Sequence, residues 1–164
     1  QSEGVGASLK HFACNNKETN RKDSDSRVSE RALREIYLKG FEICVKESEP
    51  KNIMTSYNRI NSVYGHYNYE LCTTILRDEW GYKGNVITDW WMKSERSPEF
   101  PSIRDQAYRV RAQVDVLMPG GGRSKRRRPD GTLLESLGKQ GGITLGELQR
   151  TAINVLKAVI YIKI

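Results

Sequence analysis

Residues 84–91, which read GNVITDWW, constrain the fold of this 164-residue chain more than any other stretch. The run begins with a glycine and has three consecutive β-branched residues at 86–88, so it predicts a buried strand of a parallel sheet. Asp89 lies where that strand ends. Because α/β folds carry their sites at the carboxyl ends of their strands, Asp89 is a candidate for chemistry. The alternative is that Asp89 caps the next helix or completes a turn.

Two tryptophans, Trp90 and Trp91, follow this aspartate directly. An aromatic face beside a carboxylate suits a ligand with an apolar ring face and hydroxyls round its rim, which describes a sugar. A tryptophan pair after a strand is also ordinary in a protein core. The pair therefore favours a sugar site and leaves a structural role open.

The predicted strand is one of four that alternate with helices along the chain. Strands are predicted at residues 5–13, 52–57, 84–89 and 114–118, and helices at 29–49, 69–80, 102–113 and 144–164. This order predicts an α/β fold in which (β/α) repeats form part of a TIM-like barrel, or else a small open sheet. A complete barrel takes about 250 residues, so about four βα units make an incomplete one.

The repeats predict how the chain divides. We expect a partial (β/α) barrel domain at residues 1–122, a basic and glycine-rich loop at 123–143, and a terminal helix at 144–164 that packs on the same domain. A half barrel leaves two strand edges and an apolar face uncovered. The remainder of a parent chain, or self-association, is expected to cover them.

Composition narrows the classes of function. The net charge of +7 comes partly from one basic cluster at residues 123–128, which has no interleaved aromatic residues, so we expect solvated surface there in preference to a nucleic-acid-binding site. Three widely spaced cysteines predict reduced thiols, with neither a metal site nor a disulfide framework. No metal or cofactor is expected.

No run predicts a membrane span, and the start shows neither an initiator Met nor a signal peptide, so we expect a piece of a longer, cytoplasmic protein.

Polar and aromatic residues collect at the predicted strand ends. The register places these residues on one rim of the sheet: Lys10, His11, Met54, Tyr57, Asp89 and Trp90. Their convergence is stronger evidence for a site than a single strand-end aspartate. Asp89 can attack an anomeric carbon as a nucleophile, and the Tyr57 phenol can donate to the carboxylate and orient it. Lys10, His11 and Arg21 offer donors that suit vicinal hydroxyls.

Each of these residues also has a structural alternative. His11 can be a satisfied core histidine, and Lys10 can extend its stem over apolar surface or pair with Glu18. Met54 is better suited to forming the wall of a site than to taking part in a reaction. Arg21 lies among many surface charges, and Tyr57 is a fair core residue by type.

Several ordered motifs resemble glycoside hydrolase family 3, the family of many β-glucosidases. KHFACNN at residues 10–16 and ETNR at 18–21 are similar to one conserved segment of that family, and SERALREIYL at 29–38 to its following helix. MTSYN at 54–58, LRDEWG at 76–81, TDW at 88–90 and DVLMPG at 115–120 are similar to later segments. The resemblance runs over residues 4–122 and, more loosely, the last helix.

The resemblance implies a retaining β-glycosidase, similar to β-glucosidases, that hydrolyses terminal β-D-glycosyl residues. It implies that Asp89 is the nucleophile, that Lys10, His11 and Arg21 bind sugar hydroxyls, and that Met54, Tyr57 and Trp90 shape the subsite. The family's acid/base Glu belongs to a following domain that this chain lacks. The loop acids Glu18, Glu95 and Glu99 are not placed opposite Asp89 by anything in the sequence, so we expect the isolated chain to turn over poorly or not at all.

Two positions depart from the family pattern, and two other functions stay open. Ser62 and Trp91 stand where the family commonly has glycine. A non-catalytic carbohydrate-binding or assembly module is the main alternative function. A nucleic-acid module based on residues 123–128 is the weaker one.

Overall fold

The computed structural model describes residues 1–119 and 131–161, so the basic cluster at 123–128 lies outside the described residues. The described residues include a parallel sheet with strand order β1-β3-β6-β7. Its strands are β1 (Ser8–Phe12), β3 (Asn52–Thr55), β6 (Asn85–Trp90) and β7 (Val116–Met118). The sheet is open, with β1 and β7 at its edges, which confirms the predicted α/β fold with an incomplete barrel.

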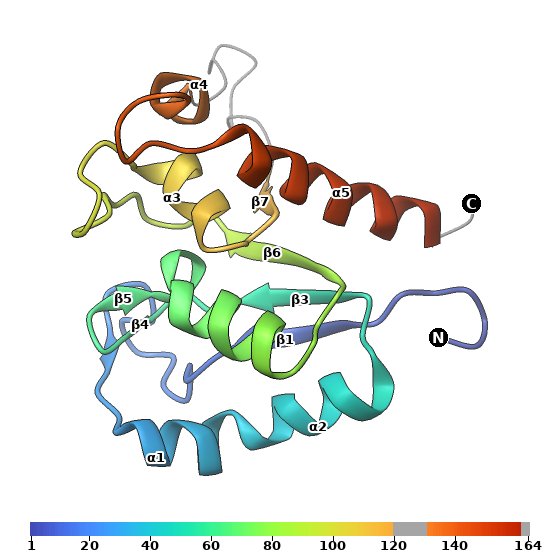
Figure 1. The fold of residues 1–164 in the computed structure, drawn as a ribbon. Coiled ribbons are helices and arrows are strands. Elements are labelled where there is room, and N and C mark those ends of the chain that lie inside the picture. Colours follow the sequence, from blue (N-terminus) through green and yellow to red (C-terminus); the bar gives the residue numbers. More distant parts are fainter. Residues whose placement is uncertain (120–130, 162–164) are drawn as a thin grey trace.

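Helices follow each strand, as the alternation predicted. After β1 come α1 (Glu30–Ala32), η1 (Leu33–Tyr37) and α2 (Lys39–Ser48), and η3 (Glu70–Glu79) lies between β3 and β6. After β6 and β7 come α3 (Asp105–Arg111), α4 (Thr132–Ser136) and α5 (Leu145–Tyr161). In Figure 1, η3 lies in front of the sheet, α1 and α2 lie below it, and α3 and α5 lie above it.

The predicted helix boundaries differ from those observed in three places. The helix predicted at 29–49 begins at its Ser29 N-cap but is broken into three segments. The helix predicted at 102–113 is shorter, because Arg104 is extended and forms a β-bridge with Arg96, so the helix begins only at Asp105. The predicted loop at 123–143 contains the short helix α4.

A second, small sheet, which the sequence did not predict, forms mainly between the strand predicted at 52–57 and the helix predicted at 69–80. It consists of β2 (Asp25–Ser26), β4 (Arg59–Ile60) and β5 (Val63–Tyr64), followed by the 3₁₀ turn η2 (Gly65–Tyr67). Asn61 and Ser62 connect β4 to β5 with φ angles of 49° and 81°. Two residues with positive φ are what a tight hairpin with a type I′ turn requires, and glycine adopts that conformation most easily. This explains why glycine suits the position that Ser62 occupies.

The main core forms between the sheet and the helices that cover it. Ile53 of β3 and Val86 of β6 are fully buried and belong to one cluster with Ile75 and Leu76 of η3. Phe12 of β1 joins the same cluster, which the apolar alternation of strands and helices predicts. Among the described residues, no helix is both long enough and apolar enough to cross a membrane.

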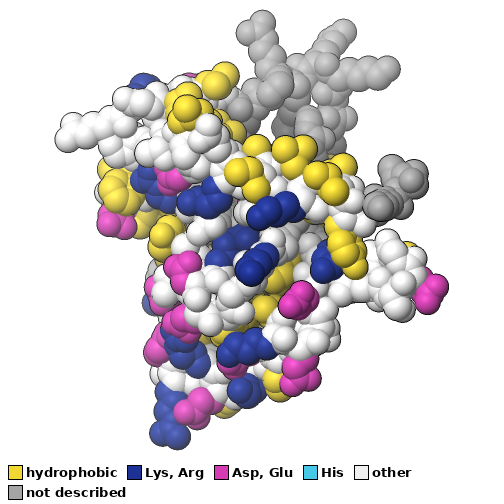
Figure 2. All heavy atoms as spheres, turned by 45° about the vertical axis from the view of Figure 1, so that its right-hand side comes forward, with side chains coloured by type: hydrophobic (Ala, Val, Ile, Leu, Met, Phe, Trp, Pro, Cys, Tyr) yellow, Lys and Arg dark blue, Asp and Glu magenta, His cyan; other side chains and the backbone are white. Residues whose placement is uncertain are grey.

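The last helix begins as predicted but carries exposed apolar residues. The Thr144 hydroxyl accepts from the Glu147 amide, and the Glu147 carboxylate accepts from the Thr144 amide, which is a capping box. Figure 2 shows a row of hydrophobic side chains over α5. Ile153, Leu156 and Ile160, spaced three and four residues apart, are 49%, 57% and 71% exposed. This row, the α5 stripe, is an apolar face without a partner among the described residues.

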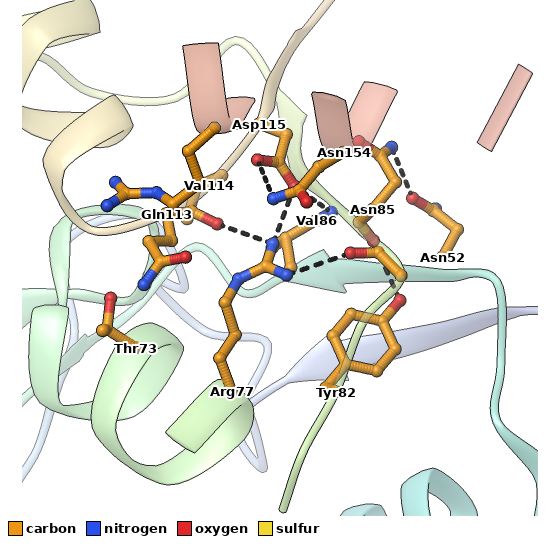
Figure 3. A network of polar contacts seen from close by, with 12 residues as sticks. Asn52, Thr73, Arg77, Tyr82, Asn85, Val86, Gln113, Val114, Asp115 and Asn154 are labelled. Atoms are coloured by element: carbon orange, nitrogen blue, oxygen red, sulfur yellow. Dashed lines mark hydrogen bonds and ion pairs between the residues drawn. The ribbon is translucent and has the colours of Figure 1, made fainter. Parts of the chain in front are cut away.

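A buried ion pair joins four elements at the amino-terminal ends of the strands (Figure 3). The Asp115 carboxylate accepts from Arg77 of η3 at 2.7 Å, from the Val86 amide of β6 at 2.9 Å and from Asn154 of α5 at 3.0 Å. Arg77 also donates to the carbonyl of Gln113 at 3.1 Å. Burial raises the pKa of Asp115, whereas Arg77 and the two other donors act in the opposite direction. The pair therefore fixes η3 and α5 against β6 and the start of β7.

Replacing Asp115 by Asn tests how much this ion pair contributes to stability. Asp115→Asn keeps the side-chain shape but removes the negative charge, so Arg77, whose side chain is 8% exposed, loses its carboxylate. Removal of one partner from a buried pair costs about 3 to 5 kcal/mol, and we expect the free energy of unfolding in urea to fall by about 3 kcal/mol. Asp78→Asn, on the exposed face of the same helix, is the control and should change stability by less than about 0.5 kcal/mol. Equal effects of the two substitutions would contradict the role of the pair.

A second titratable group is buried near the carboxyl ends of the strands. His66 is 1% exposed, and its Nε2–H donates to the carbonyl of Lys93 at 3.0 Å. Burial lowers the pKa of His66 from its ordinary 6.5 to about 3. The ring therefore stays neutral in the folded chain at a pH where the unfolded chain binds a proton.

This difference in pKa predicts a loss of stability in acid. Because the unfolded chain binds the proton at pH values where folded His66 does not, the contribution of His66 is present above pH 6.5 and falls as the pH approaches 3. Between pH 7 and pH 5 it removes about 2 kcal/mol. The free energy of unfolding, measured in urea at pH 7 and at pH 5, should therefore fall by about 2 kcal/mol less in His66→Gln than in the native chain. The same reduction is expected in a His11→Gln background; an unchanged pH dependence in both backgrounds would refute the assignment to His66.

Candidate functional site

The candidate site lies at the carboxyl ends of β1, β3 and β6, which are neighbours in the sheet. Asp89 is the penultimate residue of β6, His11 is near the end of β1, and Tyr57 follows β3 by two residues. β3 pairs in parallel with both of its neighbours, β1 and β6, and this pairing brings the three chain segments to one end of the sheet. The structure thus brings His11, Tyr57 and Asp89 together, although they are far apart in sequence.

The Asp89 carboxylate contacts a histidine and its own backbone. Its Oδ2 lies 3.6 Å from His11 Nε2, and its Oδ1 accepts from the Trp90 amide at 2.7 Å. The residue is 8% exposed and the His11 side chain is 31% exposed. One carboxylate oxygen is thus held by the backbone, and the other faces a partly accessible imidazole.

Tyr57 connects the end of β3 to the segment that follows Asp89. Its hydroxyl donates to the Trp90 carbonyl at 2.7 Å. Burial, the negative charge of Asp89 and a hydrogen bond with that carboxylate raise the pKa of Tyr57. The phenol therefore stays protonated and able to donate next to the carboxylate. The 2.7 Å bond of this hydroxyl goes to the backbone of Trp90, the residue after Asp89. That Tyr57 orients the Asp89 carboxylate stays a prediction.

Two cations from the loop after β1 lie over the Tyr57 ring. The Arg21 guanidinium and the Lys22 ammonium are each 4.7 Å from the ring centroid. Arg21 also pairs with Glu18 at 2.9 Å. Arg21 was a predicted site residue, whereas Lys22 was missed, since its only signal in the sequence is its position next to Arg21.

Hydrogen bonds under the site hold this loop in place. The Asn58 amide donates to the Ala13 carbonyl and to the Ser26 hydroxyl, both at 3.2 Å. The Ser26 hydroxyl donates to the carbonyl of Cys14 at 2.9 Å. These bonds tie the start and the end of the loop to the residues that follow β3, so the loop returns over Tyr57.

The three other predicted residues lie nearby but are less engaged. Lys10 is exposed, and its ammonium forms no hydrogen bond or ion pair with any described residue. Met54 is 7% exposed and pairs in register with Ile87 of β6. Trp90 contributes both backbone groups to the site, and its side chain is half-buried. Their roles toward a ligand stay predictions.

Thr88 lies beside the candidate site and was not predicted from the sequence. Its Oγ1 accepts from the Met118 amide at 2.8 Å and donates to the Asp89 carbonyl at 2.7 Å. It therefore joins the end of β7 to β6 beside the carboxylate, where the pairing of the two strands is irregular. The available signal was a hydroxyl in an otherwise apolar strand next to the candidate nucleophile.

Two of the three loop acids are engaged with other partners. Glu18 accepts from Asn15 at 3.0 Å besides pairing with Arg21, and Glu95 pairs with Arg59 at 3.4 Å. Glu99 lines a separate cavity.

Within the described part of the chain, no group of three or more His, Cys, Asp or Glu residues is arranged to hold a metal ion. Cys14, Cys44 and Cys72 are free thiols, as predicted, and burial raises the pKa of Cys14 to about 11.

Known proteins share both the sequence and the fold. The family described as Glycosyl hydrolase family 3 N terminal domain matches residues 1–158. A Beta-glucosidase of Ruminococcus albus is 44% identical over 156 residues, which cover 94% of this chain and 16% of that protein. An Exo-alpha-(1->6)-L-arabinopyranosidase of Bifidobacterium longum is 56% identical over 137 residues, covering 73% of this chain and 18% of the relative.

A solved structure shows the same arrangement of elements. Beta-glucosidase 3B from Thermotoga neapolitana, solved in complex with glycerol, superimposes with a TM-score of 0.83 at 40% identity. The superposition covers 98% of this chain and 22% of that enzyme. The chain thus spans only about a fifth of the length of these proteins. From the family match over residues 1–158 and the shared fold, the chain belongs to glycosyl hydrolase family 3 and forms part of its N-terminal domain.

Proposed function

We propose that this chain supplies the nucleophile side of the active site of a retaining β-glycosidase, with Asp89 as the nucleophile. The observation that carries the proposal is the position of Asp89 at the end of β6, with one oxygen held by the backbone and the other facing His11. Membership of glycosyl hydrolase family 3 supports it. The substrate class is a terminal β-D-glycosyl residue, since several relatives are named β-glucosidases.

In this mechanism Asp89 Oδ2 attacks the anomeric carbon of the sugar. A bond forms between that carbon and the carboxylate while the bond to the leaving oxygen breaks, and an acid protonates the leaving oxygen. Water then cleaves the glycosyl ester and restores the carboxylate. The Trp90 amide holds Oδ1 in both steps, so the attacking oxygen keeps its direction.

The surrounding donors suit the hydroxyls of a sugar held against Asp89. His11 and Lys10 come from β1, and Arg21 lies over Tyr57 from the following loop. Lys10 has no described partner that competes for its three donors. We propose that these three side chains bind hydroxyls, that Tyr57 maintains the backbone after Asp89, and that Met54 and Trp90 form the walls.

The proposal also explains why the isolated chain is expected to be inactive. A retaining mechanism needs a second carboxyl group about 5 to 5.5 Å from the nucleophile. Glu18 and Glu95 form ion pairs with Arg21 and Arg59, and Glu99 lines a different cavity. We therefore propose that the acid comes from outside these 164 residues.

A chimera tests the assignment directly. The chain replaces the matching segment of the Thermotoga neapolitana enzyme, 22% of that protein, and is assayed with aryl β-D-glucosides and aryl α-L-arabinopyranosides. We expect turnover by the chimera, a loss of about 1,000-fold or more in Asp89→Asn, and little or no turnover by the isolated chain. A 2-fluoro-glycoside should label Asp89, as read by peptide mass spectrometry.

The control and the contradicting results are equally specific. Asp78→Asn, an exposed change outside the site, should leave the chimera active. Labelling of another residue, or full turnover in Asp89→Asn, would dispose of the nucleophile assignment. Robust turnover by the isolated chain would refute the external acid. A folded chimera that binds sugar without turnover would favour the alternative function, a non-catalytic carbohydrate-binding or assembly module.

We further propose that other strands cover the open edges in the functional protein, either from a parent chain or from a second copy. β1 and β7 are sheet edges, and the α5 stripe is exposed. In isolation, we expect the chain to self-associate through such surface, seen as a sedimentation coefficient that rises with concentration. Leu156→Glu should weaken this association, whereas Leu134→Glu on α4 is the control. A monomer at all concentrations would contradict self-association.

A further inference from the structure

A cavity lies on the helical side of the molecule, away from the Asp89 site. It has a volume of about 600 Å³ and lies between the start of η3, the loop after β6, α3 and the start of α5. Cavities of about 300 to 1,000 Å³ hold small ligands up to the size of a drug molecule. None of the residues that line it belongs to the Asp89 site.

Aromatic rings form one part of its wall. Tyr69 is 50% exposed, although it is a large aromatic residue. Tyr108 stacks on the buried ring of Tyr67, with centroids 4.6 Å apart and ring planes 2° from parallel. Phe100 carries the Arg111 guanidinium 5.0 Å from its centroid. Tyr108 and Phe100 are therefore held in place, while Tyr69 presents a free surface to solvent.

Two opposite charges in the same cavity are left without ionic partners. The Arg150 Nη2 donates to the Val110 carbonyl at 3.1 Å, but Arg150 forms no ion pair with any described residue. Glu99 also forms no ion pair within the described part of the chain. The neighbouring Arg111 and Glu147, by contrast, pair at 2.6 Å. The cavity thus offers a cation and an anion that lack ion-pair partners among the described residues, beside its aromatic wall.

We propose that this cavity binds a short carbohydrate chain, separately from the Asp89 site. The apolar C–H face of a pyranose ring packs on an aromatic face such as Tyr69. Its hydroxyl groups donate and accept, so they can satisfy a guanidinium and a carboxylate together. An anion would satisfy Arg150 but would meet Glu99 and Glu147, whereas a neutral polyhydroxylated ligand satisfies both signs of charge.

Titration followed by NMR tests the proposal with the chain itself. Cellotetraose is the probe, and the amide shifts of residues 68–70, 97, 99, 100 and 108 should move on binding. We expect the dissociation constant to rise at least tenfold in Tyr69→Ala and in Arg150→Met. Tyr37→Ala, which removes a tyrosine that is 39% exposed on η1, is the matched control and should bind as the native chain does.

Asp89→Asn separates this inference from the proposed function. Binding that persists in Asp89→Asn and is lost in Tyr69→Ala supports a second site, whether or not the chimera turns over. Shifts confined to residues 11, 57 and 89 would place the sugar at the first site and overturn the inference. Binding of inorganic phosphate in place of cellotetraose, or no binding at millimolar sugar, would overturn it as well. Amide spectra of each variant show that it is folded.

Discussion

The buried pair between Arg77 and Asp115 is the constraint on which the arrangement of this fold depends. It fixes one helix on each side of β6, through Arg77 of η3 and Asn154 of α5, and it also engages the backbone of β6. All of these contacts lie near the amino ends of the strands. Since the elements are fixed there, the carboxyl ends of β1, β3 and β6 are free to carry polar side chains that contribute little to packing.

The site lies at the opposite ends of the strands from this ion pair. Asp89, His11 and Tyr57 come from segments at the ends of three neighbouring strands, so the parallel pairing of β1, β3 and β6 sets how these residues lie relative to one another. The loop that carries Arg21 is held separately, through Asn58 and Ser26. The cavity beside Tyr69 depends on a third set of elements, the helices and the loop after β6. The Asp89 site and this cavity thus have no residue in common.

Much of the fold was predictable because its strands and helices have regular patterns. The apolar run before Asp89 and the helical spacing of Leu71, Ile75 and Leu76 both correspond to observed elements. Short elements were missed, since β2, β4 and β5 have two residues each and form only by pairing with one another. In the site, the strand-end residues were found from their register. Lys22 and Thr88 were missed, because loop folding and a cross-strand bond decide their positions.

The amino-acid sequence by itself determined the order of strands and helices, the capping of α1 and α5, and the family, because each rests on local patterns or on motifs of contiguous residues. Tertiary structure alone decided that His11 faces Asp89, that Tyr57 bonds to the Trp90 backbone, and that Arg150 and Glu99 share a cavity without pairing. Such contacts join residues distant in the chain. The distances in these contacts depend on how the strands and helices pack and on which polar groups become buried. A local sequence pattern encodes neither of these.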